Sequence, residues 1–133
     1  AWKPAKVLQL PREGGGNLFI KTHPNSEHIW CDRPLHNNPD MATSLFVINK
    51  KTLENKQTIQ IPEKWRKGTR AVHLEYNKNG DEVWVAVWGR KDQPTAILVY
   101  DDKTLQLKAE ITGDWILTPT GHFNVWNTAK DIY

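Results

Sequence analysis

The stretches LFVINKKTL at residues 45–53 and ILVYDDKTL at residues 97–105 share one pattern, and this pattern decides the fold class. In each stretch an apolar run is followed by a polar pair and then by Lys-Thr-Leu. Short β-branched and aromatic runs that end in polar turns are typical of β-hairpins. One more short strand follows each stretch, TIQI at 58–61 and KAEI at 108–111. The two stretches therefore predict the second half of a unit that occurs twice.

The first half of the unit is also repeated. HPNSEHIW at 23–30 and YNKNGDEVW at 76–84 both place a polar turn just before a strand that contains a tryptophan. Four short strands that recur about every 40 to 50 residues are the signature of propeller blades. The expected strands are Leu18–Lys21, His28–Asp32, Leu45–Asn49, Thr58–Ile61, Ala71–Tyr76, Glu82–Trp88, Ala96–Asp101 and Leu107–Ile111.

A third unit is expected to begin after Ile111, where ILTPTGHFNVWNT places Trp126 in the position of Trp30 and Trp84. We therefore predict an all-β chain with about two and a half four-stranded blades of a β-propeller. The blade-like units are expected at about 14–61 and 71–111, with a half-blade at 115–133. An open β-sandwich is the alternative arrangement of the same strands. Blades cannot bury their faces alone, so the isolated chain is expected to self-associate.

Composition excludes several classes of protein. No apolar run approaches the roughly 20 residues that span a bilayer, so no membrane segment is expected. The net charge of +3 is scattered, and its densest group is interrupted by Trp65 and Gly68, which does not favour nucleic-acid binding. The opening AWKPAKVLQL lacks the features of a signal peptide, so this end is expected to be mature or to derive from within a longer protein.

No motif of a self-contained catalytic or metal site is present. Cys31 is the single cysteine, lies in the apolar run HIWC and is expected to be a buried, inert thiol. The five histidines have no metal-ligand spacing, and no Gly-x-Ser-x-Gly elbow occurs. We expect His23 to position a turn, His28 to face outward from its strand and His36 to be solvated in a polar loop.

Two features are candidates for ligand contact. His73 lies in the first strand of a unit, and first strands line the central channel of a propeller, although a structural histidine is the alternative. In the run 118–121, Thr-Pro-Thr-Gly, glycine allows a planar ligand to approach the backbone and threonine offers a hydroxyl. The triple glycine at 14–16 is not followed by the Lys-Ser/Thr of a phosphate loop. We interpret it as a linker, with close contact to a ligand or another backbone segment as the alternative.

Four segments in one register resemble the C-terminal part of the d1-haem domain of cytochrome cd1 nitrite reductases. They are GGGNLFIKTHP (14–24), EYNKNGDEVWVAVW (75–88), DDKTL (101–105) and TPTGHFNVWNT (118–128). The resemblance covers nearly the whole chain, with length changes in loops 33–42 and 89–94. It implies an eight-bladed propeller with haem d1 in its central cavity, in a periplasmic denitrification enzyme that reduces nitrite to nitric oxide by one electron.

The resemblance also implies site residues. Thr120 and Gly121 correspond to haem d1 contacts, Phe19 to a residue near the macrocycle, and His73 to a position where the family often has Gln. The iron ligand and the histidines that act on nitrite lie upstream of the matched region. No catalytic or metal-ligating residue is therefore expected in this chain, and haem c is expected only in a separate N-terminal domain.

The implied partners are the rest of the propeller, the c-haem domain, nitrite and a periplasmic electron donor such as a c-type cytochrome or cupredoxin. A homodimer is implied for the full-length protein, without nucleic acid or membrane. Two alternatives stay open: a d1-haem biosynthetic relative with the same propeller, and a propeller scaffold that binds no cofactor.

Overall fold

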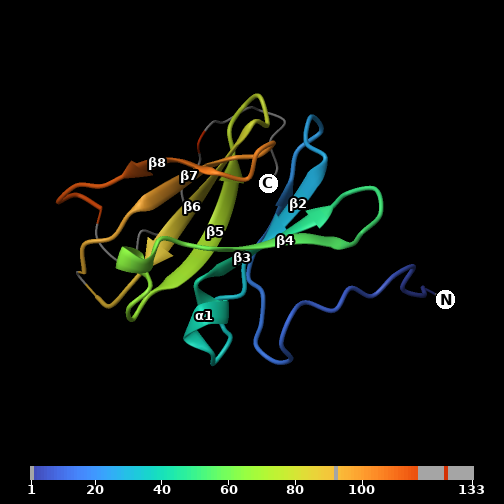
Figure 1. The fold of residues 1–133 in the computed structure, drawn as a ribbon, viewed down its shortest axis with the longest axis horizontal. Coiled ribbons are helices and arrows are strands. Elements are labelled where there is room, and N and C mark those ends of the chain that lie inside the picture. Colours follow the sequence, from blue (N-terminus) through green and yellow to red (C-terminus); the bar gives the residue numbers. More distant parts are fainter. Residues whose placement is uncertain (1, 92, 117–124, 126–133) are drawn as a thin grey trace.

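The computed structural model describes residues 2–91, 93–116 and 125. These residues form two four-stranded antiparallel sheets, each with its strands in chain order (Figure 1). The first sheet contains β1 (Ile20–Thr22), β2 (His28–Cys31), β3 (Ser44–Asn49) and β4 (Asn55–Gln60). The second contains β5 (Arg70–Tyr76), β6 (Glu82–Trp88), β7 (Ile97–Asp101) and β8 (Leu107–Ile111). The predicted all-β class and the four strands per unit are confirmed.

The repeated Lys-Thr-Leu segments form the same turn. In the β3–β4 hairpin, Asn49 Oδ1 accepts hydrogen bonds from the backbone N–H groups at positions 51 and 52, and Leu53 has a left-handed φ of 55°. In the β7–β8 hairpin, Asp101 Oδ1 accepts from positions 103 and 104, and Leu105 has a φ of 62°. The sequence repeat is therefore also a repeat of backbone geometry.

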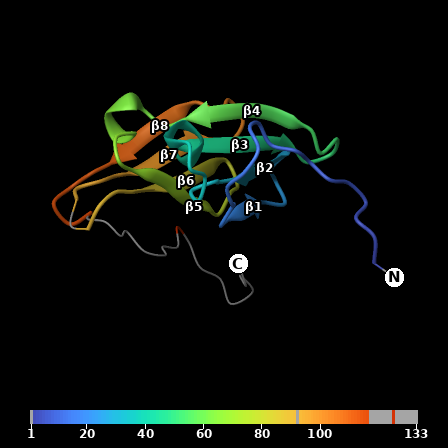
Figure 2. The same ribbon diagram turned by 90° about the horizontal axis from the view of Figure 1, so that it is seen from below.

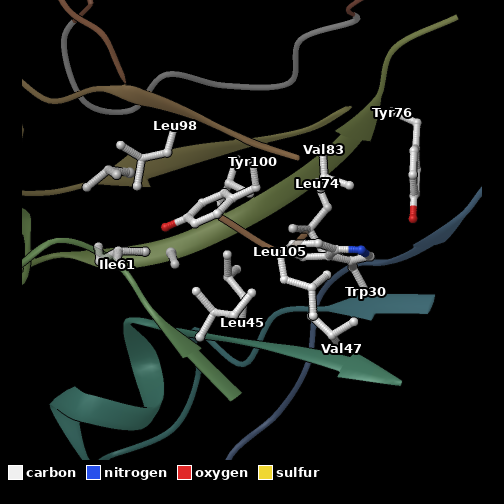
Figure 3. Packing of buried hydrophobic residues seen from close by; sticks show 14 of the residues in the cluster. Trp30, Leu45, Val47, Ile61, Leu74, Tyr76, Val83, Leu98, Tyr100 and Leu105 are labelled. Carbon is white, nitrogen blue, oxygen red and sulfur yellow. The ribbon is translucent and has the colours of Figure 1, made fainter. Parts of the chain in front are cut away.

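The main core lies between the two sheets (Figure 3). Trp30, Leu45 and Val47 face it from the first sheet, and Leu74 and Leu98 face it from the second. All five side chains are fully buried. Burial of apolar surface contributes about 25 cal/mol per Å², so this shared core is what holds the sheets together.

The sheets are arranged with equivalent strands on the same side of the molecule. β1 and β5 lie on one side, and β4 and β8 lie on the other (Figure 2). β1 also contacts β5 directly. The first strands of the two repeats are therefore neighbours, and side chains at their ends can form one site.

Two short helices lie in the connections between strands. A 3-10 helix at Glu63–Trp65 lies between β4 and β5 and so connects the two sheets. Helix α1 (Pro39–Ala42) lies in a loop where the sequence predicted none; Asn38 caps it and Pro39 occupies its first turn. Among the described residues, no helix has the length and apolarity required to cross a membrane.

The predicted half-blade at 115–133 falls largely at residues 117–124 and 126–133, which lie outside the described part of the chain. Its strands, and Trp126 with them, therefore stay predictions. The sequence-based division into units at 14–61, 71–111 and 115–133 likewise stays a prediction.

Candidate cofactor-contacting site

Phe19 and His73 are brought together where the two sheets meet. Phe19 directly precedes β1, and His73 lies in β5. Their rings are stacked, with centroids 4.5 Å apart and planes inclined by 28°. Two residues that were singled out separately in the sequence thus form one stacked aromatic pair at the first strands of the two repeats.

The carboxylate of Asp32 holds the backbone of both residues of this pair. Its Oδ1 accepts hydrogen bonds from the backbone N–H of Leu18 at 2.8 Å and of Phe19 at 2.9 Å. Its Oδ2 accepts from the backbone N–H of His73 at 3.0 Å. Burial raises the pKa of Asp32, while the three N–H donors oppose that shift because they stabilise the carboxylate. Asp32 therefore links the two sheets through hydrogen bonds to their backbones. The sequence analysis did not identify Asp32 as a site residue.

A β-bulge in β5 aims the His73 side chain. Val72 pairs with Ala86 and Leu74 pairs with Val85, so His73 is the extra residue between two ladder positions. Its φ of 64° is uncommon for a residue with a side chain. The backbone hydrogen bond to Asp32 stabilises this geometry. The imidazole is 3% exposed.

Two charged groups border the aromatic pair. Glu75 Oε1 lies 3.0 Å from His73 Nε2 and 3.2 Å from Lys21 Nζ. Burial raises the pKa of Glu75, but hydrogen bonds from His73 and Lys21 outweigh it, so the net shift is downward. The carboxylate is thus ionised and shared between a lysine on β1 and a histidine on β5.

The triple-glycine loop before Phe19 is anchored. Arg33 donates from Nη1 to the carbonyl oxygen of Pro11 at 2.6 Å and from Nη2 to that of Gly14. Gly15 has a φ of 72° and packs so closely on His36 that a Cβ would lie 2.5 Å from the His36 Cα. The close approach of Gly15 to the His36 backbone therefore favours close contact with another backbone segment over a simple linker.

Three histidines away from the pair have structural partners. His23 supports its turn as expected, since its Nδ1 accepts from Asn25 N. His28 and His36 are not outward-facing or solvated, because they are 3% and 8% exposed. His28 Nδ1 donates to the Asp102 carbonyl oxygen at 2.8 Å, and His36 lies 3.0 Å from that of Glu13. Both rings are therefore buried and make hydrogen bonds to residues that are distant in the sequence.

Cys31 is buried, as expected, and desolvation raises the pKa of its thiol to about 12, which disfavours the thiolate form. Within the part of the chain that the structure describes, no three His, Cys, Asp or Glu side chains are grouped so that they could hold a metal ion. Thr120 and Gly121, the other predicted contacts, lie outside the described residues.

The fold and the sequence together define a class. Residues 1–128 match the cytochrome D1 heme domain, and the chain belongs to this family.

Among particular relatives, a nitrite reductase of Stutzerimonas stutzeri is 46% identical over 139 residues, which cover 99% of this chain and 24% of the relative. Protein NirF of Pseudomonas aeruginosa is 27% identical over 86 residues, 65% of this chain and 19% of the relative. A solved structure of dihydro-heme d1 dehydrogenase NirN in complex with DHE has a TM-score of 0.61 and 26% identity, and covers 74% of this chain and 19% of NirN. The chain thus spans about a quarter of these relatives or less, and the resemblance predicted from sequence is confirmed.

Proposed function

We propose that this chain is the C-terminal part of a d1-haem nitrite reductase and forms part of the wall of the haem cavity in an eight-bladed propeller. The observation that carries the proposal is the stacked pair of Phe19 and His73 at the meeting edge of the sheets. The 46% identity to a nitrite reductase over 99% of the chain supports the activity. The longer protein is called the parent protein below.

The described residues fit a haem of the d1 type. A flat macrocycle with carboxylate edges needs an aromatic or apolar surface beneath it and N–H or cationic groups at its rim. Phe19, which is half-buried, would provide the aromatic surface, with the 3% exposed ring of His73 stacked against it. Lys21, paired with Glu75, would provide a cation beside it. Thr120 and Gly121 complete the proposed contacts.

The haem, when bound, supplies the one-electron chemistry that converts nitrite to nitric oxide. The residues of this chain orient the cofactor and shape the charge around it. The iron ligand, the residues that act on nitrite and a c-haem domain are proposed to lie elsewhere in the parent protein. We further propose a periplasmic homodimer that receives electrons from a c-type cytochrome or a cupredoxin.

A role in d1-haem biosynthesis is the second candidate. The similarity to NirF and to NirN supports it, since NirN is described as a dihydro-heme d1 dehydrogenase. His73 in place of the glutamine common among nitrite reductases is in keeping with this alternative.

The test is reconstitution of the parent protein with d1 haem, followed by absorption spectra and nitrite-dependent nitric oxide release. We expect a d1-type spectrum and turnover. Phe19→Ala and Thr120→Val should each weaken haem binding about tenfold, because each removes one packing or hydrogen-bonding contact worth about 1.4 kcal/mol. A bound haem without nitric oxide release favours the biosynthetic role. A protein that binds no haem overturns both candidates and leaves a cofactor-free scaffold.

A further inference from the structure

Glu75 is the acceptor that His73 and Lys21 share. Both donors approach the same oxygen, Oε1, at 3.0 Å from His73 Nε2 and 3.2 Å from Lys21 Nζ. The side chains of Lys21 and Glu75 are 8% and 16% exposed, so solvent competes little for these contacts. The three groups come from β1 and β5, the strands that meet at the proposed cofactor wall.

The chemistry of this contact determines where the imidazole carries its proton. An ionised carboxylate accepts hydrogen bonds but cannot donate them. His73 Nε2 must therefore carry the hydrogen that points at Glu75. In the neutral ring this selects the Nε2–H tautomer, and Nδ1 is then the acceptor nitrogen.

Two further contacts of His73, with Asp32 and with Phe19, are nearly the same for both tautomers. Asp32 binds its backbone N–H, which fixes the main chain. Phe19 stacks on the face of the ring, and stacking is nearly the same for both tautomers. Of these three contacts, the one with Glu75 distinguishes the two ring nitrogens, since it is made by Nε2.

We propose that Glu75 is a positioning residue for His73. It fixes the Nε2–H form and the ring orientation, and Lys21 holds Glu75 in place and balances its charge. The proposal rests on the proposed function only in naming d1 haem as the ligand that meets the ring so oriented. Without that ligand, the contacts of Glu75 with Lys21 and His73 would still join β1 to β5, but they would have no role in cofactor binding.

The experiment uses the parent protein labelled with [¹⁵N]histidine, with and without d1 haem. Ring nitrogens with and without a proton resonate far apart, so the spectrum reports the tautomer; the His73 signal is assigned by its loss in His73→Gln. Glu75→Leu removes the acceptor. Glu75→Gln retains a carbonyl oxygen that accepts from Nε2–H. Glu82→Leu is the matched control, since Glu82 also accepts from a lysine, Lys108 at 2.5 Å, and from a tryptophan N–H, away from His73.

We expect one tautomer in the unsubstituted protein, in Glu75→Gln and in Glu82→Leu, and a mixture of tautomers in Glu75→Leu. Haem affinity should fall about tenfold in Glu75→Leu and recover in Glu75→Gln, the change expected for one lost hydrogen-bonded contact. A single Nε2–H tautomer in a folded Glu75→Leu protein overturns the proposal. If Glu75→Leu does not fold, the opposite tautomer in unsubstituted protein or in Glu75→Gln overturns it equally. Failure to bind haem with the tautomers as expected would refute the proposed function but not the role of Glu75.

Discussion

Two neighbouring aspartates at the end of β7, Asp101 and Asp102, have opposite environments. Asp102 is 5% exposed, and its carboxylate accepts from Trp30 Nε1 at 2.9 Å, from Tyr76 Oη at 2.7 Å and from Ser26 Oγ at 2.7 Å. It therefore links side chains of both sheets. Asp101 lies at the surface and caps the β7–β8 turn. One acid joins the two sheets, and the other serves only its own turn.

Asp102→Asn should destabilise the parent protein by about 1–3 kcal/mol, because an amide nitrogen cannot accept and at least one buried donor loses its partner. Asp101→Asn is the matched control and should be nearly neutral, since Asn49 makes the same turn contacts in the first hairpin. Urea unfolding of both variants measures the difference. Equal losses would mean that the buried network contributes no more than a surface cap.

Glu75 gives stability a defined dependence on pH. Its pKa in the folded protein lies below the ordinary value of 4.5, so its contribution is complete above about pH 4.5 and is lost as the pH falls through the folded-state pKa. Glu75→Gln should therefore lower stability by about 1 kcal/mol at neutral pH and progressively less in acid. Unfolding of both proteins between neutral and acidic pH measures this. A difference that stays constant down to pH values well below 4.5 would show that the charge of Glu75 is not the cause.

At the scale of elements, contacts with His36 and Arg33 position the triple-glycine loop. Gly15 and Gly68 both have a left-handed φ, 72° and 69°. A Cβ on Gly15 would meet the His36 backbone at 2.5 Å, whereas one on Gly68 would meet nothing within 4 Å. Alanine substitutions at these two positions therefore distinguish the cost of backbone strain, which both share, from the cost of a steric clash, which only Gly15 has.

Gly68→Ala should cost about 1 kcal/mol from left-handed backbone strain alone. Gly15→Ala should cost that amount and about 1–3 kcal/mol more from overpacking against His36. It should also weaken d1-haem binding, because the loop leads directly to Phe19. Thermal unfolding and haem titration of the two alanine variants provide the comparison. Identical stabilities would contradict a tightly packed loop.

The elements differ in how far the sequence predicts them. The two Lys-Thr-Leu hairpins were predicted because their turns are determined by local hydrogen bonds, such as those of Asn49 and Asp101. Helix α1 was missed because four residues are too few to show a helical period. Phe19 was identified from family resemblance, and His73 already from its place in the first strand of a unit. Their stacking was not predicted, because it depends on Asp32 and on the bulge in β5. The burial of His28 was mispredicted for the same reason, since its partner Asp102 is 74 residues away.

At the scale of the whole molecule, one face of the first sheet is covered only in part, by Leu8 and Leu10 of the N-terminal segment. The face away from the second sheet carries a mainly apolar groove of about 420 Å³, and Ile29, Cys31 and Ile48 lie in its floor. Leu18 and Ile20 at its edge are 50% and 65% exposed. In the proposed propeller, the preceding blade covers this face, as the second sheet covers the other.

The isolated chain should therefore self-associate, and Ile20→Lys should reduce that association by placing a charge on this face. In the parent protein the same substitution should instead cost about 1–3 kcal/mol, because a lysine would replace an apolar side chain in a blade interface. Light scattering of the isolated chain and thermal unfolding of the parent protein measure the two effects. An isolated chain that stays monomeric at all concentrations, or a parent protein that Ile20→Lys does not destabilise, would mean that no blade packs on this face. The opposite signs expected in the two contexts distinguish a blade interface from an ordinary surface patch, which would gain solubility in both.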